Sequence, residues 1–356
     1  MSKFHQLTVS EIKSETPDCV SVTFEVPSNL LKDYEYIQGQ HLTLKLLVNG
    51  KEVRRSYSLC SSPLIKEPLR VAVKRVTNGI GSNHINDTFK KGDVVEVMTP
   101  MGNFHTELKS TNRKHYVLFA GGSGITPMLS IIKTTLIAEP QSKLTLFYGN
   151  FDENTTIFKK ELDEIVAQNE GRLTLHYIFQ VPPAPNFPAE LTGMLTKDKV
   201  KELISKYLER NPVIEYFVCG PGPMMDNVKE VLENNNVNKA FIHIEYFTSA
   251  IEEPKKDAAD IHGAVCEVTV IADGKETTFQ LATDGDAILD AAMDAGVDAP
   301  FSCKGAVCAT CRAKVMEGKV SMSMNYALTD DEVEEGYILT CQAHPTTPIV
   351  LVDYDR

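Results

Sequence analysis

The first part of the chain alternates apolar and polar residues. Residues 20–26 and 42–46 place an apolar side chain at every second position, which is typical of half-buried strands. Asn49-Gly50 stands between two runs of this kind and predicts a tight hairpin. Closely spaced strands with turn residues between them indicate a small antiparallel β-barrel, which we place over residues 1–108.

Strands and helices alternate between residues 109 and 248. Four apolar runs of strand length occur here, at residues 115–120, 144–148, 173–179 and 214–219, with helical stretches between them. Alternation of this kind builds a parallel sheet covered by helices, so we expect an α/β domain.

The last part of the chain reads as a separate α+β domain. Residues 249–262 have no apolar periodicity and predict a linker. Beyond them, Asp273-Gly274 lies between two strand-like runs and predicts another hairpin, and residues 286–295 predict a helix. A third domain over residues 263–356 follows, which agrees with a chain of 356 residues being too long for one ordinary core.

Four of the eight cysteines have the spacing of an iron–sulfur site. Cys303, Cys308 and Cys311 form a C-x4-C-x2-C motif, and Cys341 follows further along, which is the plant-type spacing for a [2Fe–2S] cluster. Gly305 and its small neighbours would let backbone N–H groups approach the sulfurs. The alternatives are a zinc site, which usually shows two C-x2-C pairs, and ordinary buried cysteines.

Two glycine-rich turns follow strands of the predicted α/β domain. The first, at residues 120–127, ends a strand and begins a helix, with Thr126 as the predicted N-cap and Pro127 at the first helical position. The second, at residues 218–223, has an ordinary Gly/Pro turn as its alternative. Because ligands collect at the carboxyl ends of parallel strands, the two turns could share one dinucleotide.

One strand of the predicted barrel carries residue types that suit a flavin. In the run Arg55-Ser56-Tyr57-Ser58, an arginine suits a phosphate, a tyrosine a ring face and a serine a ring nitrogen. Strand alternation would place Arg55 and Tyr57 on the same side. A surface strand of mixed residues is the alternative. Residues 78–83 open a short helix and give a second candidate phosphate site.

The excess negative charge lies at the C-terminal end. The net charge is −12, and residues 251–356 hold 20 Asp and Glu against 8 Lys and Arg. This argues against a nucleic acid partner and suggests an acidic docking face for a basic protein, unless the charge only aids solubility. With no apolar run of about 18 residues and no signal-peptide core, we expect no membrane association and a cytoplasmic location.

Together these motifs resemble the ferredoxin–NADP reductase superfamily in its oxygenase-reductase arrangement, with a C-terminal β-grasp-like, plant-type ferredoxin domain. The resemblance covers essentially the whole chain and rests on residues 39–42, 55–58, 303–314 and 326–333. It implies an NAD(P)H-dependent oxidoreductase that passes electrons through FAD, with FMN left open, to the cluster and on to an oxygenase. The identity of the partner oxygenase stays open, with a phenylacetyl-CoA epoxidase, a ring hydroxylase and a demethylase as the candidates. A non-enzymatic redox or metal-binding protein is the remaining alternative.

The resemblance also implies roles for single residues. The flavin would be held by Arg55, Tyr57, Ser58, Val73, Lys74, Arg75, Gly81 and Ser82. The nicotinamide dinucleotide would be held by Gly122, Gly124, Thr126, Pro127, Cys219, Gly220 and Pro221. The reacting rings would meet beside Tyr57, Ser58, Cys219, Glu245 and Phe247.

One position departs from the family pattern. In relatives that use NADPH, the strand ending in Tyr148-Gly149-Asn150 often continues with an arginine for the 2′-phosphate, and here Phe151 stands at that place. Lys159 and Lys160 are the nearby cations that could compensate. The choice between NADH and NADPH therefore stays open.

Overall fold

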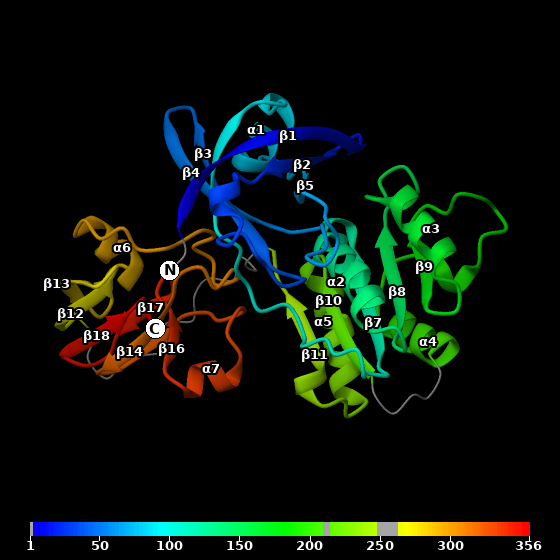
Figure 1. Ribbon diagram of the computed structural model, residues 1–356. Coiled ribbons are helices and arrows are strands. Elements are labelled where there is room, and N and C mark those ends of the chain that lie inside the picture. Colours follow the sequence, from blue (N-terminus) through cyan, green and yellow to red (C-terminus); the bar gives the residue numbers. More distant parts are fainter. Residues whose placement is uncertain (1–2, 209–213, 248–262) are drawn as a thin grey trace. The chain divides into compact units, whose positions relative to one another are not determined.

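The computed structural model describes residues 3–208, 214–247 and 263–356. The predicted linker at residues 249–262 lies outside these ranges. The chain divides into two compact units. One comprises residues 4–53 and 57–245, and the other Tyr246–Arg356 together with residues 1–3 and 54–56. The elements of each unit are labelled in Figure 1.

Six strands form the predicted barrel. They are β1 (Phe4–Thr16), β2 (Cys19–Glu25), β3 (His41–Val48), β4 (Lys51–Ser58), β5 (Leu69–Lys74) and β6 (Val94–Met98), in the order β4-β3-β6-β1-β2-β5. An antiparallel bridge between Leu59 and Val71 brings the two edges of the sheet together. Asn49 and Gly50 both have positive φ, 52° and 77°, as the predicted hairpin requires. Helix α1 (Ile80–Thr88) follows β5.

A five-stranded parallel sheet forms the core of the α/β lobe, as predicted. Its order is β11-β10-β7-β8-β9, and its strands are β7 (His115–Gly121), β8 (Lys143–Asn150), β9 (Leu173–Phe179), β10 (Ile214–Cys219) and β11 (Ile242–Glu245). The helices are α2 (Ile125–Ala138), α3 (Lys159–Gln168), α4 (Lys197–Tyr207) and α5 (Gly222–Asn234). Short 3-10 turns lie at Ser28–Leu30, Gly122–Gly124, Ala189–Leu191 and Lys239–Phe241.

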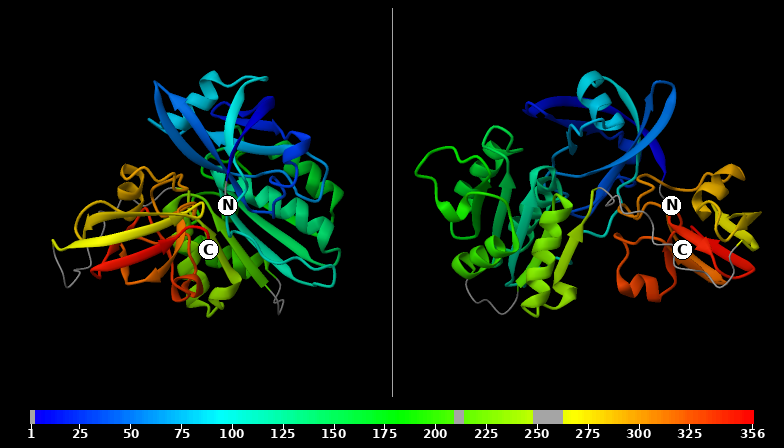
Figure 2. Two further views of the ribbon diagram at one scale, coloured as in Figure 1. Left: turned by 60° about the vertical axis from the view of Figure 1, so that its left-hand side comes forward. Right: turned by 180° about the vertical axis from the view of Figure 1, so that it is seen from behind.

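Helices cover both faces of this sheet (Figure 2). Successive side chains of a strand point to opposite faces. Leu118 and Tyr148 therefore join the cluster that contains α2, whereas Phe147 points the other way, toward Tyr207 of α4. The sheet order reverses between β7 and β10, so the carboxyl ends of these strands form the place where an open α/β sheet binds its ligand.

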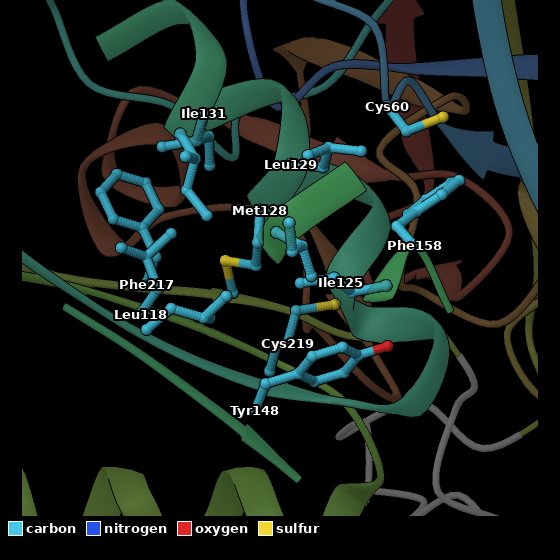
Figure 3. Close-up of a cluster of buried hydrophobic side chains, with 14 of the residues drawn as sticks. Cys60, Leu118, Ile125, Met128, Leu129, Ile131, Tyr148, Phe158, Phe217 and Cys219 are labelled. Carbon is cyan, nitrogen blue, oxygen red and sulfur yellow. The ribbon is translucent and has the colours of Figure 1, made fainter. Parts of the chain in front are cut away.

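The barrel and the α/β lobe share one hydrophobic core. Cys60 and Phe104 from the barrel side lie in the same buried cluster as Met128, Ile132 and Phe217 of the α/β lobe. Figure 3 shows α2 at the centre of this cluster, with Cys60 and Phe158 on one side of it and Leu118 and Cys219 beneath it. Helix α2 is apolar on nearly all sides because it packs against both the sheet and the barrel.

The C-terminal unit has the predicted α+β character. Its main sheet runs β13-β12-β18-β14-β16, and β15 and β17 form a separate ribbon. The elements are β12 (Val265–Ala272), β13 (Lys275–Ala282), α6 (Ile288–Asp294), β14 (Arg312–Glu317), β15 (Val320–Met322), α7 (Asp330–Glu334), β16 (Tyr337–Leu339), β17 (Ala343–Pro345) and β18 (Ile349–Asp353). Asp273 and Gly274 have positive φ in the predicted hairpin, 53° and 69°. Across the three described ranges, no helix combines the length and apolar character needed to cross a bilayer.

Candidate functional site

The two glycine-rich turns lie against each other at the switch point of the sheet. Strands β7 and β10 pair in register, with Ala120 opposite Cys219. A Cβ on Gly124 would overlap the Cys219 carbonyl and come within 2.8 Å of the Gly220 nitrogen, so only glycine fits there. A Cβ on Gly121 would lie 2.6 Å from the Pro221 ring. The close approach leaves backbone N–H groups and the start of α2 available to a diphosphate.

The helix after the first turn begins earlier than predicted. Gly124 occupies the N-cap position, and Ile125 is the first residue of α2. The Thr126 hydroxyl donates to the Ser123 carbonyl at 3.0 Å, so Thr126 as the N-cap is wrong. Thr126 and Pro127 are buried, whereas Gly122 and Ser123 are half-buried at the surface of the turn. Any contact of Thr126 with a dinucleotide would therefore be made by its backbone.

Tyr148 holds the first turn in place, a role the sequence analysis missed. Its hydroxyl lies 3.0 Å from the Gly122 carbonyl and 3.3 Å from the Ile157 carbonyl, so it joins the turn to the segment before α3. Burial raises the pKa of Tyr148 well above its usual value, which keeps the hydroxyl protonated as a donor. A tyrosine on a fully buried strand needs a partner for its hydroxyl, and this was the available signal.

Three of the predicted reactive residues come together at the ends of their strands. The Ser58 hydroxyl of β4 donates to Glu245 Oε2 of β11 at 3.0 Å. Glu245 stands opposite Cys219 in the pairing of β11 with β10. The Cys219 thiol is fully buried, and burial followed by the charge of Glu245 raises its pKa well above the ordinary value. The thiol is therefore protonated and neutral, and does not act as a thiolate.

The remaining predicted residues of β4 differ in burial. Arg55 is exposed and its Nη1 donates to the Arg54 carbonyl at 2.7 Å, whereas Ser58 is buried. The Tyr57 ring packs partly against the barrel core and keeps one part at the surface. On the neighbouring β5, the Val73 side chain is fully buried in the barrel core. Val73 could therefore touch a flavin only through its backbone.

Lys74 supplies positive charge near the first glycine turn, and α1 supplies backbone N–H groups. Lys74 Nζ lies 3.5 Å from Asp18 Oδ2 and 3.9 Å from the position of a Cβ on Gly122. Arg75 Nη2 pairs with Asp87 Oδ1 at 2.7 Å. Gly81 and Ser82 are buried in the first turn of α1, where the Ser82 hydroxyl accepts the Val76 N–H at 3.1 Å. The start of α1 can thus offer backbone N–H groups to a phosphate.

The end of β8 presents an aromatic ring and carboxylates. The Phe151 side chain is 57% exposed, and its carbonyl accepts the Val181 N–H at 2.8 Å. Lys159 Nζ is held by Glu153 at 3.2 Å and Asp163 at 2.9 Å. Lys160 is 92% exposed and 3.9 Å from Glu164. Lys159 is therefore already paired with carboxylates, whereas Lys160 extends into solvent.

Phe247 belongs to the C-terminal unit and is 37% exposed. Its placement beside the flavin stays a prediction. In the same unit, the Tyr246 and Tyr326 rings lie 5.1 Å apart.

The cysteine loop is strained in a way that aims N–H groups at the sulfurs. Lys304, Ala306 and Ala309 all have positive φ, between 50° and 62°, a region that residues with a side chain rarely adopt. The Gly305 N–H donates to Cys303 Sγ at 3.3 Å. Successive turns of this kind form anion-binding concavities of the sort found at iron–sulfur sites. The sequence predicted this role for Gly305 and its small neighbours, and nothing in it indicated the positive φ of Lys304, Ala306 and Ala309.

The four thiols interact as two pairs, Cys303 with Cys308 and Cys311 with Cys341. Hydrogen bonding within each pair lowers the pKa of Cys308 and of Cys341. Within the described residues, no three His, Cys, Asp or Glu side chains surround one point suited to a single ion. A plant-type [2Fe–2S] cluster takes four thiolates, and these four cysteines can supply them. The donor set therefore fits [2Fe–2S].

Three family models match the chain in the order of its three parts. An oxidoreductase FAD-binding domain matches residues 6–106, and an oxidoreductase NAD-binding domain matches residues 118–230. A 2Fe-2S iron-sulfur cluster binding domain matches residues 270–346.

Several relatives match the chain over its whole length. It is 40% identical to a component of the 1,2-phenylacetyl-CoA epoxidase of Escherichia coli (strain K12), covering 100% of this chain and 99% of that protein. It is 34% identical to the ferredoxin reductase component of 3-ketosteroid-9-alpha-monooxygenase from Rhodococcus rhodochrous, covering 98% and 96%. The solved structure of phthalate dioxygenase reductase is similar, with 25% identity, a TM-score of 0.59 and 98% of each chain covered.

Proposed function

Because the chain belongs to the ferredoxin–NADP reductase superfamily, with FAD-binding, NAD-binding and [2Fe–2S] domains, we propose that it is the reductase component of a phenylacetyl-CoA epoxidase complex. The 40% identity over the full length to a component of such an epoxidase carries this proposal. The chain is an oxidoreductase that transfers electrons from NAD(P)H through FAD to the cluster, so the non-enzymatic alternative is wrong. Relatives that serve other monooxygenases keep a different oxygenase partner as the second candidate.

The flavin supplies the conversion between a hydride, which brings two electrons, and the single electrons that an iron–sulfur cluster accepts. In our proposal Arg55 holds its phosphate, the Tyr57 ring covers the isoalloxazine and Ser58 faces N5. The hydrogen bond from Ser58 to Glu245 fixes the orientation of the serine hydroxyl. Lys74 and Arg75 contact the arm of the flavin, and Gly81 and Ser82 bind its pyrophosphate through the start of α1.

The nicotinamide dinucleotide is proposed to bind across the two glycine turns. Gly122, Gly124 and the start of α2 bind the diphosphate, while Cys219, Gly220 and Pro221 border the nicotinamide. The buried neutral Cys219 keeps water away from that ring without adding charge. Glu245 and Phe247 complete the proposed reactive centre, and we retain the boundaries 1–108, 109–248 and 263–356 for the three domains.

An acidic surface beside the cluster loop is the proposed docking face. Helix α7 exposes Asp330, Asp331 and Glu334. It is held near the cysteines because Arg312, which directly follows Cys311, pairs with Glu332 of α7 at 2.8 Å. Tyr326 also donates its backbone N–H to the Ala306 carbonyl of the cluster loop at 3.1 Å. A basic patch on the oxygenase would be steered to this side of the cluster.

The electron path is tested by anaerobic titration with NADH and, separately, with NADPH. We expect bleaching of the flavin absorbance and a rhombic EPR signal from a reduced [2Fe–2S] cluster. The partner is tested by adding the oxygenase components of a phenylacetyl-CoA epoxidase and measuring epoxide formation. Flavin and cluster reduction without epoxide formation would refute the epoxidase assignment but leave the reductase activity intact.

Charge reversal tests the docking face. Replacing Asp330 and Asp331 by lysine is expected to raise the KM for the oxygenase roughly 10-fold at low salt, with reduction by NADH unchanged. The matched control reverses Glu267 and Glu276. They are exposed on β12 and on the edge strand β13, on the far side of the sheet from β16, which α7 contacts. Equal effects of the two double variants would show that only net charge matters.

A further inference from the structure

Four charged side chains join the barrel to the α/β lobe. Arg70 Nη2 of β5 lies 2.8 and 2.9 Å from the two carboxylate oxygens of Glu161 on α3. Lys133 Nζ of α2 lies 2.8 Å from Glu67 Oε2 and 3.1 Å from Glu161 Oε1. Each lobe contributes one cation and one carboxylate. We call these four residues the interlobe ion cluster.

The interlobe ion cluster is largely shielded from water. The exposed fraction of its side chains is 11% for Lys133, 17% for Arg70, 23% for Glu67 and 24% for Glu161. Burial would raise the pKa of Glu161, but hydrogen bonds and charge from Arg70 and Lys133 lower it below the ordinary value. Glu161 is therefore charged at neutral pH, and removing one of its partners leaves a poorly solvated charge behind.

A further hydrogen bond between the lobes is linked to this cluster through Ser62. Glu67 Oε1 accepts the Ser62 N–H, and the Ser62 hydroxyl lies 2.9 Å from the Thr134 hydroxyl of α2. Two residues of the loop before β5 thus contact neighbouring residues of α2: Glu67 contacts Lys133, and Ser62 contacts Thr134. The hydrogen bonds of an ion pair are directional. The ion pairs therefore fix the position of one lobe relative to the other more precisely than apolar contacts do.

Phe158 shows that the start of α3 is held under strain. It occupies the position before the helix with φ of 59°, a conformation that is costly for a bulky residue, and its side chain is 2% exposed. The Arg70 guanidinium lies over its ring at 5.0 Å from the centroid. The strained turn places Glu161 in the first turn of α3, where it reaches Arg70.

The same segment is connected to the nucleotide turn. Tyr148 contacts the carbonyls of both Gly122 and Ile157, and Ile157 directly precedes Phe158. A shift at the start of α3 would therefore also displace the turn that is proposed to hold the diphosphate.

We propose that the interlobe ion cluster positions the α/β lobe against the barrel so that the nicotinamide and the flavin meet at hydride-transfer distance. Hydride transfer needs near contact of the two reacting atoms, so a displacement of about 1 Å between the lobes slows it on the order of 100-fold. Glu67, Arg70, Lys133 and Glu161 are positioning residues, which act through β5, α2 and α3. This inference rests on the electron-transfer activity and does not depend on which oxygenase is the partner.

The test replaces Glu161 by glutamine in the full-length holoprotein, which keeps the volume and removes the charge. The control is Glu164→Gln on the same helix, whose contact with Lys160 stays within α3. Anaerobic stopped-flow absorbance measures flavin reduction at saturating NADH. We expect the limiting rate to fall at least about 10-fold in Glu161→Gln, and the rate of Glu164→Gln to match the wild type.

A second readout separates positioning from simple destabilisation. Hydrogen–deuterium exchange of residues 60–70 is expected to speed up in Glu161→Gln, with flavin and iron content unchanged. Arg70→Lys, which keeps the charge and loses the guanidinium geometry, is expected to give an intermediate rate.

Wild-type limiting rates in both Glu161→Gln and Arg70→Lys would overturn the proposal. If Glu161→Gln fails to fold, Arg70→Lys decides alone, and a wild-type rate and exchange pattern in it would overturn the proposal. Loss of reduction in Glu164→Gln as well would show that α3 tolerates no change, and would equally refute a specific role for the cluster.

Discussion

Replacing Gly124 by alanine is expected to separate the two glycine turns. The added Cβ would overlap the Cys219 carbonyl and lie 2.8 Å from the Gly220 nitrogen, both of which are backbone atoms that cannot rotate away. Cβ atoms in proteins essentially never approach other atoms within 3.0 Å. The turn must therefore move by about 1 Å, which costs roughly 1–3 kcal/mol when a close-packed interior is overfilled.

This cost has two measurable consequences. The midpoint of thermal unfolding of the unit should fall by roughly 2–12 °C, at about 2–4 °C per kcal/mol for a unit of this size. A turn displaced by about 1 Å should also lower kcat/KM for flavin reduction by NADH on the order of 100-fold. Circular dichroism and anaerobic stopped-flow absorbance measure the two effects. The cluster EPR signal after chemical reduction should be unchanged, because the C-terminal unit has its own core.

Gly222→Ala is the matched control for this prediction. Gly222 lies within the second turn, at the start of α5, and a Cβ there meets nothing within 4 Å, so this variant adds a methyl group to the same region without a clash. We expect wild-type unfolding and reduction in this variant. If Gly124→Ala also binds and oxidises NADH like the wild type, the two turns are not packed as described and the assignment of the nucleotide site to them is refuted.

Three further predictions concern other parts of the chain. Phe151→Arg should raise kcat/KM with NADPH roughly 10-fold and leave that with NADH nearly unchanged, since an arginine at the end of β8 can pair with a 2′-phosphate; no gain with NADPH would place the adenosine elsewhere. Cys311→Ala should abolish the [2Fe–2S] EPR signal and cytochrome c reduction while NADH–ferricyanide activity persists through the flavin; a retained signal would exclude Cys311 as a ligand. Burial would raise the pKa of Glu215, but His243 and Lys114 hold it at about 2, so its stabilising charge is present above the ordinary carboxyl value of 4.5 and is lost as pH falls through about 2. The unfolding midpoints of wild type and Glu215→Gln should therefore differ at pH 7 and converge toward pH 2, and a constant difference would contradict the assigned pKa.

The sequence predicted those features that depend on local pattern. The alternation of apolar residues indicated the barrel and the parallel sheet, and the hairpins at Asn49-Gly50 and Asp273-Gly274 were confirmed because their backbone conformation suits these residues. The family, the FAD and NAD domains and the [2Fe–2S] domain are confirmed by the three family models. Ser58 and Glu245 share a hydrogen bond, and their place beside the flavin stays a prediction.

The sequence could not predict features that arise only from packing. Threonine is a residue type that favours the N-cap position, so the sequence predicted Thr126 there. In the structure Gly124 packs against Cys219 and the helix already begins at Ile125. The positive φ of Lys304 and Ala306 has no signature in residue type, since neither residue favours that conformation. The interlobe ion cluster joins residues up to 94 positions apart in the chain, and no short-range sequence pattern relates residues that far apart.

The shared core around α2 bears on how this protein can be divided or recombined. Residues from the barrel and from the α/β lobe fill one buried cluster, so a cut between them would expose apolar surface on both halves. We expect neither half to be stable when expressed without the other. The C-terminal unit, by contrast, has separate buried clusters of its own. Gene fusion or fission is therefore expected to move the first two lobes together as one heritable module, and to exchange the cluster-binding unit independently.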